Sequence, residues 1–252
     1  MSLLGLHGDV ASPRTLLWLH GFTQTRHSAS VLRSILAVQA SVVTVDLPGH
    51  GENAHIDLNL EHTADEIAAA LPDQPMVVGG YSLGGRVALH LALAHPNRVR
   101  SLVLLGATRG IENDDERAQR RHRDEALADH AEQIGIDPFL DEWLAQPMFA
   151  RVGDDAAERA TRSRDVHGLA RSLRHMGTGT QRWLGEEIAS LAMPVWALAG
   201  EHDKKFLREA RAIAARAPSA EWRSVPGAAH AAHLENPEWV ASVIGEALRV
   251  NQ

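Results

Sequence analysis

The sequence predicts an α/β protein with a doubly wound, mostly parallel sheet and a helical cap inserted after the fourth strand. Two observations lead to this class. Short apolar runs alternate with helical stretches along the chain, and most runs are continuously apolar, as in parallel strands covered on both faces. The alternation then breaks once, over residues 109–187, where no strand-like run occurs.

The expected strands are short runs rich in Leu or in β-branched residues, and the expected helices carry apolar residues at helical spacing. Pro96 provides a stop signal for one of these helices. The strands are residues 16–20, 42–46, 76–80, 101–105, 195–199 and 222–225. The helices are residues 63–71, 86–94, 208–217 and 237–249.

Residues 109–187 are polar, helical in pattern and rich in charge, with twelve of the 23 Arg of the chain. They differ from a linker because Trp143, Phe149 and similar residues give them apolar faces that can pack. We therefore expect residues 1–108 and 188–252 to form the core. Residues 109–187 would then be a cap inserted into it, not an independent domain.

Composition excludes several classes of protein. The 252 residues carry a net charge of −7, which argues against nucleic acid as a partner. No apolar run reaches membrane-spanning length and no secretory signal is recognisable, so we expect a cytoplasmic protein without membrane insertion. The absence of Cys excludes disulfides, thiolate metal sites and Cys nucleophiles, and we expect no bound metal.

The strongest local signal is the pentapeptide Gly80-Tyr81-Ser82-Leu83-Gly84, which matches G-x-S-x-G. It follows an expected strand and precedes an expected helix, which is the context that a nucleophile elbow requires. Small residues are needed because the turn is tight. The turn would hold the Ser82 hydroxyl at the carboxyl edge of the sheet.

A serine needs a histidine to take its proton, and the histidine needs an acid to orient it. Asp203 comes just after the fifth strand, with Glu201 as an alternative nearer the strand end. His230 comes after the sixth strand, whereas His233 is expected to pack or to cap the following helix. The predicted triad is therefore Ser82, Asp203 and His230, in the chain order that this motif favours.

Two backbone N–H groups are expected to form an oxyanion hole. One belongs to Leu83, which follows the nucleophile at the positive end of a helix. The other belongs to Phe22 in the His-Gly-Phe loop after the first strand. We expect His20 to support this loop by hydrogen bonding, and residues 46–51 to form a structural loop at the mouth of the site.

Taken together, these motifs resemble those of the α/β-hydrolase superfamily, and the resemblance covers nearly the whole chain. Such motifs indicate the fold but say little about the substrate. They are H-G-F at 20–22, D-L-P-G-H-G at 46–51, G-x-S-x-G at 80–84, G-x-x-D at 200–203 and H-x-x-H-x-E-x-P at 230–237.

Five segments resemble more closely the 2-succinyl-6-hydroxy-2,4-cyclohexadiene-1-carboxylate synthase family of menaquinone biosynthesis. The resemblance implies a cofactor-free lyase whose triad serine acts as a general base. Its substrate would be the tricarboxylate 2-succinyl-5-enolpyruvyl-6-hydroxy-3-cyclohexene-1-carboxylate, from which it would eliminate pyruvate. The segments are residues 79–88, 116–120, 143–150, 200–206 and 230–237.

We expect Arg side chains to bind a trianionic substrate, because a guanidinium group can bind a carboxylate through two parallel hydrogen bonds. Arg86 comes four residues after Ser82, about one helical turn away. The resemblance implies that Arg86, Arg120 and Arg162 hold carboxylates. Arg164 is the alternative to Arg162.

The resemblance also implies that Tyr81 and Trp143 line the site of the substrate ring. A different activity uses the same triad. A carboxylesterase or a carbon–carbon bond hydrolase would employ Ser82 as a covalent nucleophile instead of a base. The sequence leaves this alternative open, together with the oligomeric state.

Overall fold

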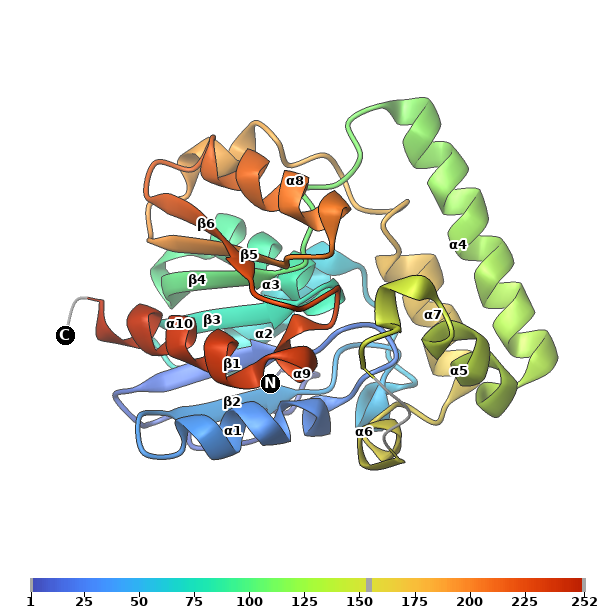
Figure 1. Cartoon of the computed structure of the whole chain (residues 1–252), viewed down its shortest axis with the longest axis horizontal. Helices are drawn as coiled ribbons and strands as arrows, with labels where there is room; N and C mark the ends of the chain where they lie inside the picture. Colours follow the sequence, from blue (N-terminus) through green and yellow to red (C-terminus); the bar gives the residue numbers. More distant parts are fainter. Residues whose placement is uncertain (1, 153–155, 251–252) are drawn as a thin grey trace.

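A six-stranded parallel sheet forms the centre of the computed structural model, with strand order β2-β1-β3-β4-β5-β6 (Figure 1). The structure describes residues 2–152 and 156–250. Residues 1, 153–155 and 251–252, which the expected core and cap ranges include, lie outside the described residues. The strands are β1 (Thr15–Leu19), β2 (Ser41–Val45), β3 (Met76–Tyr81), β4 (Val99–Leu105), β5 (Val195–Gly200) and β6 (Ala220–Val225).

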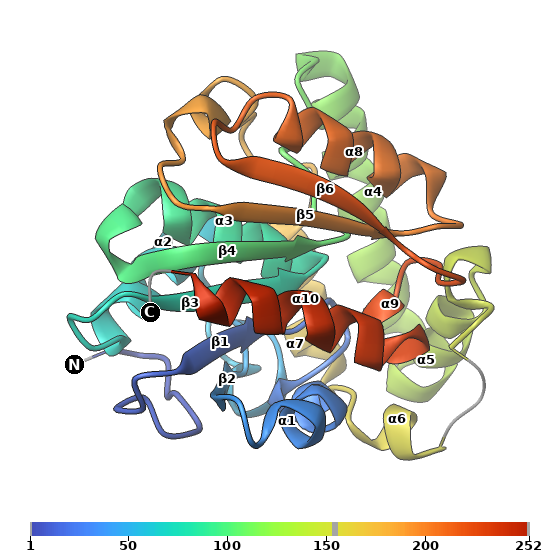
Figure 2. The same ribbon diagram turned by 60° about the vertical axis from the view of Figure 1, so that its left-hand side comes forward.

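Helices cover both faces of the sheet, so the predicted fold class is confirmed. Helices α1 (Ser30–Leu36) and α10 (Pro237–Arg249) pack on one face, and Figure 2 shows α10 crossing in front of the strands. The opposite face carries α2 (Leu60–Ala70), α3 (Leu83–Ala94) and α8 (Lys204–Ala214). The four-residue helix α9 (Ala232–Glu235) precedes α10.

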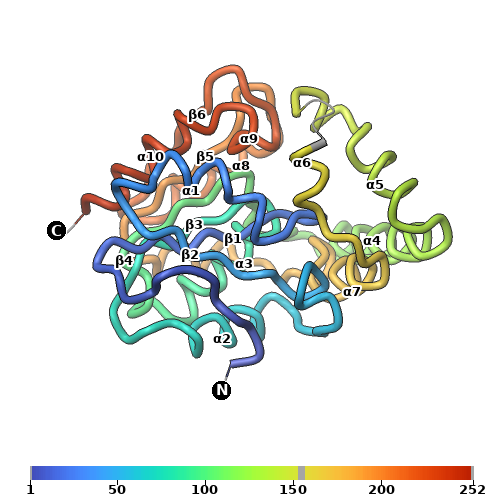
Figure 3. Tube along the Cα trace, turned by 90° about the horizontal axis from the view of Figure 1, so that it is seen from below, coloured from blue at the N-terminus to red at the C-terminus, as the bar shows by residue number. Residues whose placement is uncertain are grey.

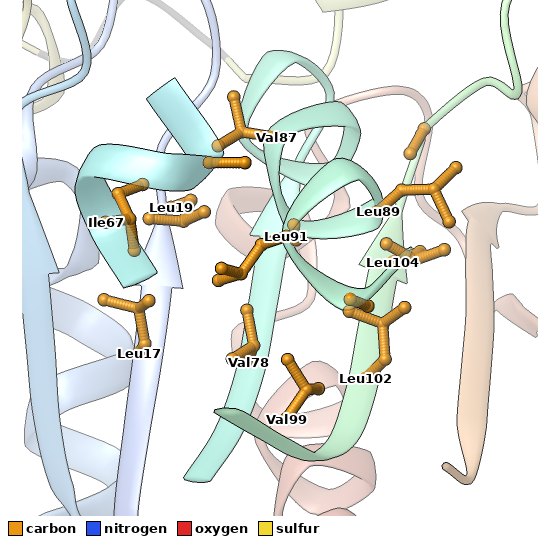
Figure 4. Close-up of a cluster of buried hydrophobic side chains, with 14 of the residues drawn as sticks. Leu17, Leu19, Ile67, Val78, Val87, Leu89, Leu91, Val99, Leu102 and Leu104 are labelled. Atoms are coloured by element: carbon orange, nitrogen blue, oxygen red, sulfur yellow. The ribbon is translucent and has the colours of Figure 1, made fainter. Parts of the chain in front are cut away.

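Alternate residues of each strand enter opposite layers of the core. In β1, Leu17 and Leu19 pack with the α2 and α3 layer, whereas Leu16 and Trp18 pack with the α1 and α10 layer. Figure 4 shows the first layer, where Leu17, Leu19 and Val78 lie against the helices. Burial on both faces explains why these strands are apolar at nearly every position.

The strand order reverses between β1 and β3, because β2 pairs on one side of β1 and β3 on the other. Loops that leave neighbouring strands at such a point diverge, and they open a crevice at the carboxyl edge of the sheet. The loop after β1 and the turn after β3 meet there. These are the two segments in which the sequence places Phe22 and Ser82.

Helices α4 (Asp114–Ile134), α5 (Ile136–Leu144), α6 (Ala156–Ala160) and α7 (Val166–Met176) lie between β4 and β5 in the chain. In Figures 1 and 3 they gather on one side of the sheet. Phe22, in the loop after β1, packs against the ring of Trp143 of α5 and against a buried cluster of the insert that includes Phe139. The helical insert therefore faces the loop that carries Phe22. The division into a core and a dependent cap stays a prediction.

Some elements differ from expectation. The sequence analysis did not predict α1, which buries only Leu32 and Leu36 and is too short to show a clear helical period. Helix α2 begins three residues earlier than expected, because the Asn59 side chain accepts a hydrogen bond from the N–H of His62 and caps it. Short 3-10 helices cover Arg26–Ala29, Gly51–Asn53, Pro96–Arg98, Pro147–Phe149 and Glu187–Ser190.

Within residues 2–152 and 156–250, no helix combines the length and the apolar character that a bilayer crossing would need.

Candidate active site

Ser82 occupies a strained turn between β3 and α3, with φ 52° and ψ −107°. Positive φ is unfavourable for a residue with a side chain, and such strain is typical of functional turns. Two glycines allow the close passage of strand and helix. A Cβ on Gly84 would lie 2.1 Å from the Leu19 carbonyl oxygen, and one on Gly80 would lie 2.4 Å from the Gly84 carbonyl carbon. The turn thus has the geometry of the predicted nucleophile elbow.

We expect Gly84→Ala to lower the free energy of unfolding by about 1–3 kcal/mol, because its methyl group would collide with backbone. Alanine is a better helix former than glycine, so helix propensity alone predicts the opposite sign. Urea denaturation measures the difference. Gly5→Ala is the matched control, since a Cβ there meets no atom within 4 Å. Equal stability of both variants and wild type would contradict the packing argument.

The side chains of Ser82, Asp203 and His230 meet at the carboxyl edge of the sheet. His230 Nδ1 lies 2.7 Å from Asp203 Oδ2, and His230 Nε2 lies 3.2 Å from Ser82 Oγ. Because a carboxylate can only accept, Nδ1 carries the proton and Nε2 is free to accept one from the Ser82 hydroxyl. His230 is 3% exposed, and the Phe206 ring packs on it at 4.5 Å between centroids.

The structure distinguishes between the two candidate acids. Asp203 contacts His230, and its second oxygen accepts a hydrogen bond from the N–H of Phe206, which caps α8. Glu201 is exposed and accepts a hydrogen bond from the N–H of Gly227 at 2.8 Å. Glu201 therefore holds the loop before the histidine and makes no contact with it.

Glu235, whose role the sequence analysis did not explain, holds the backbone around His230. Its two carboxylate oxygens accept hydrogen bonds from the N–H groups of Ala229 and Ala231, at 2.6 and 3.1 Å. These two residues flank the histidine in the chain. Glu235 is the acidic residue of the H-x-x-H-x-E motif, and its position in the motif could have predicted this contact.

Hydrogen bonds of His20 hold the loop after β1, as expected, and they require a neutral ring. His20 Nδ1 donates to the Gly21 carbonyl at 2.8 Å, and His20 Nε2 accepts from the N–H of Leu47 at 3.0 Å. This pair of contacts needs the neutral ring, and burial lowers the pKa of His20. The 46–51 loop is likewise structural: Asp46 accepts hydrogen bonds from the Arg26 N–H and side chain.

A cavity of about 510 Å³ adjoins Ser82 and His230. Tyr81, Trp143, Phe22 and Leu83 contribute to its lining, as their predicted roles require. The cavity is cationic, because among its lining residues four side chains are basic and only one is acidic. These are Arg86, Arg120, Arg123, Lys205 and Asp124.

Two of these cations, Arg123 and Lys205, were not predicted from the sequence as site residues. Arg123 lies three residues after Arg120, on the same face of α4, and this spacing was an available signal. Lys205 lies two residues after Asp203, at the start of α8. Among the described carboxylates, none forms an ion pair with Arg123 or Lys205.

Arg86 is a buried cation without an acidic partner in the described part of the chain. Its Nη1 donates to the Met176 carbonyl at 2.8 Å. Burial and the nearby charge of Arg120 lower the pKa of Arg86 to about 10. Arg120, in contrast, donates to Asp124 at 2.7 Å, and Asp124 also accepts from the N–H of Gly179. The Asp124 carboxylate acts on Arg86 electrostatically but forms no ion pair with it. A buried charge without an ion-pair partner is unfavourable, so the position beside Arg86 favours an anion.

Arg162 is not among the residues that line the cavity. Its Nε and Nη2 donate to Glu158 at 3.0 and 2.6 Å, and its Nη1 donates to the Thr23 hydroxyl. The guanidinium therefore joins the insert to the loop after β1. Arg164 also lies away from the lining, exposed and paired with Asp137. Substrate binding by Arg162 stays a prediction.

Within the described segments, no group of three or more His, Asp or Glu side chains is placed to hold a metal ion. Besides the triad and the four cations, the polar side chains that line the cavity include Thr108, Asp124, Gln146, Ser172 and Thr178.

The chain is similar to known proteins in sequence and in fold. A family model described as the alpha/beta hydrolase fold matches residues 14–237. A 2-succinyl-6-hydroxy-2,4-cyclohexadiene-1-carboxylate synthase of Escherichia coli O1:K1 / APEC is 30% identical over 250 residues, which cover 96% of each chain. A protein of Bacillus subtilis strain 168, named provisionally as the same synthase, is 33% identical over 243 residues, covering 91% of this chain and 88% of its own.

Among solved structures, MenH from S. aureus superposes with a TM-score of 0.88 at 27% sequence identity. The match covers 99% of this chain and 98% of that one. Such coverage means that the likeness includes the helical insert as well as the sheet.

Proposed function

This chain belongs to the α/β-hydrolase family and, within it, to the 2-succinyl-6-hydroxy-2,4-cyclohexadiene-1-carboxylate synthases, and we propose that it is a lyase acting in menaquinone biosynthesis. It would eliminate pyruvate from 2-succinyl-5-enolpyruvyl-6-hydroxy-3-cyclohexene-1-carboxylate. The chain's own acid–base groups can supply each step, so the proposal includes no cofactor.

The single observation that carries the proposal is the buried Arg86, one helical turn from Ser82 and without a carboxylate partner among the described residues. An esterase that acts on neutral substrates does not require the Arg86 guanidinium beside its catalytic serine. A tricarboxylate supplies the missing anion beside the catalytic serine. Arg120, Arg123 and Lys205 line the same cavity and provide further positive charge for the remaining carboxylates.

Proton transfer would begin at Ser82. His230 accepts the hydroxyl proton at Nε2, and the Ser82 oxygen removes a proton from the substrate ring. Asp203 stabilises the imidazolium that results. As the ring double bond shifts, the carbon–oxygen bond to the enolpyruvyl group breaks and its electrons leave with the enolate. The His230 imidazolium gives its proton to the enolate, which becomes pyruvate, while the ring proton stays on the Ser82 oxygen and restores the hydroxyl. No bond between substrate and enzyme forms in this sequence of steps.

The N–H groups of Phe22 and Leu83 would stabilise the negative charge that develops on the substrate when the proton leaves. Both residues line the cavity. Within the described chain, no acceptor is hydrogen-bonded to the N–H of Phe22. Leu83 opens α3, where the first N–H groups of a helix lack intrahelical partners.

We expect steady pyruvate release from the tricarboxylate with no burst and no acyl-enzyme, because Ser82 acts as a base. Aryl esters should be hydrolysed slowly despite the assembled triad, since they leave Arg86 without an anion. Stopped-flow kinetics and intact-protein mass spectrometry test both points. A stoichiometric burst with the natural substrate, or ester hydrolysis that outpaces pyruvate release, would favour the carboxylesterase or carbon–carbon hydrolase instead.

A further inference from the structure

We propose that Gln24 and His233 form a positioning pair that fixes the oxyanion loop, residues 20–24, from the side opposite the cavity. Neither residue lines the cavity, and the mechanism above uses neither. Both are nonetheless buried polar side chains, each about 1% exposed. Such groups are unfavourable in a core unless their hydrogen bonds serve a purpose.

The contacts of Gln24 converge on the loop that carries the Phe22 N–H. Its side-chain Oε1 accepts from the N–H of Gly21 at 3.0 Å, and its backbone N–H donates to the Gly21 carbonyl at 3.1 Å. That carbonyl belongs to the same peptide plane as the N–H of Phe22. His20 Nδ1 and the Gln24 backbone N–H hold this carbonyl, and because the two groups of a trans peptide point in opposite directions, they direct the Phe22 N–H the other way. The Gln24 side chain holds the preceding peptide plane at the Gly21 N–H, so the peptides on both sides of Gly21 are fixed.

The amide orientation of Gln24 determines the state of His233. Since Oε1 must face the N–H of Gly21, the Nε2 amide group faces His233 Nε2, 3.2 Å away. His233 Nε2 must then accept, which requires a neutral ring protonated at Nδ1. Burial independently lowers the pKa of His233 to about 3. A protonated His233 would place two donors face to face and break the contact.

Packing alone does not account for the histidine. The His233 ring packs at a tilt against Tyr81, with 4.3 Å between ring centroids, and lies near Trp18, contacts that an apolar ring could also make. Its Nδ1 is buried and has no hydrogen-bond partner among the described residues. The unpartnered nitrogen is unfavourable, so the bond at Nε2 to Gln24 is the contact that only a histidine or a similar acceptor can provide here.

The inference rests on the proposed function in one respect: the Phe22 N–H must stabilise charge in the transition state. Loss of the pair would leave the substrate's carboxylate contacts unchanged but would misplace this donor. Removing an oxyanion donor outright lowers kcat by about 10²–10³-fold. Misplacing it should lower kcat by a part of that factor, with KM little changed.

We would measure pyruvate release by Gln24→Met, which keeps volume but removes the amide, and by His233→Phe, which keeps an aromatic ring on Tyr81. We expect kcat to fall at least tenfold in Gln24→Met and at least threefold in His233→Phe, with KM within twofold of wild type. The double variant should be little slower than Gln24→Met, because both changes break the same contact. His233→Gln, whose amide oxygen can accept from Gln24, should recover most of the rate.

Two matched controls separate positioning from stability. His90→Phe and Gln181→Met replace buried polar residues that do not line the cavity, and they should leave kcat unchanged whatever their effect on the melting temperature. Wild-type kcat in Gln24→Met, a change confined to KM, or equal kcat in His233→Phe and His233→Gln would overturn the inference. Absence of pyruvate release by wild type would instead refute the proposed function. The variant-to-wild-type ratios on an aryl ester would then still test the pair.

Discussion

Replacing Ser82 or His230 by alanine is expected to lower the rate of pyruvate release at least about 10⁴-fold while the protein stays folded. The reason is the hydrogen-bonded chain from Ser82 through His230 to Asp203, with distances of 3.2 and 2.7 Å. Neither alanine variant should unfold the protein, because the removed side chains line a cavity rather than fill the core. Steady-state kinetics and circular dichroism together measure this.

The double variant Ser82→Ala/His230→Ala should be little slower than either single variant, because residues that act as one unit give non-additive losses. Asp203→Ala should also be strongly impaired. Glu201→Gln is its matched control: the amide oxygen can still accept from the N–H of Gly227, so activity should be close to wild type. Turnover by Ser82→Ala at the wild-type rate, or equal losses in Asp203→Ala and Glu201→Gln, would refute the triad.

Replacing Arg86 by methionine is expected to lower kcat/KM for the tricarboxylate by about 10- to 150-fold. A hydrogen bond to a charged group contributes about 1.5–3 kcal/mol, and each 1.4 kcal/mol is a factor of ten. The same variant should be at least as stable as wild type, because a buried charge without a carboxylate partner is replaced by an apolar side chain of similar length. Arg86→Met is therefore expected to lower kcat/KM without lowering the melting temperature.

Arg120→Ala should lose at least about tenfold in kcat/KM, since the same bond energy is at stake. Arg117 and Arg174 are the matched controls on the insert. They do not line the cavity and pair with surface acids: Arg117 with Asp114, and Arg174 with Glu125 among others. Their alanine variants should change kcat/KM less than about threefold. Equal losses at all positions would mean that the insert acts as a diffuse positive field and not through the named arginines.

The local cation density matters because the chain as a whole is acidic. Its net charge of −7 would repel a trianion at long range. Exposed charges are screened within about 10 Å at 0.1 M salt. The four basic side chains that line the cavity act at closer range than this, so they decide binding there.

Much of the fold follows from the sequence because it depends on local pattern. The six strands lie within two residues of their predicted starts and ends. For β1 to β5 the reason is that strands covered on both faces leave a nearly continuous apolar run, whereas β6 is partly exposed. Helix α1 is the exception, because its seven residues bury only Leu32 and Leu36. The tight turn at Ser82 could also be predicted from the sequence, because the turn requires the small residues Gly80 and Gly84 independently of the rest of the fold.

What only the tertiary structure decided is which side chains meet. Asp203 and Glu201 are chemically alike and two residues apart, yet only Asp203 reaches His230. Arg162 and Arg123 both lie on the insert, but Arg123 lines the cavity whereas Arg162 binds Glu158 and Thr23. The spacing of residues along the chain determines a turn, a strand or a helix. The partner of a charged side chain depends on how each helix is rotated against segments that can be more than a hundred residues away in sequence, as Thr23 is from Arg162.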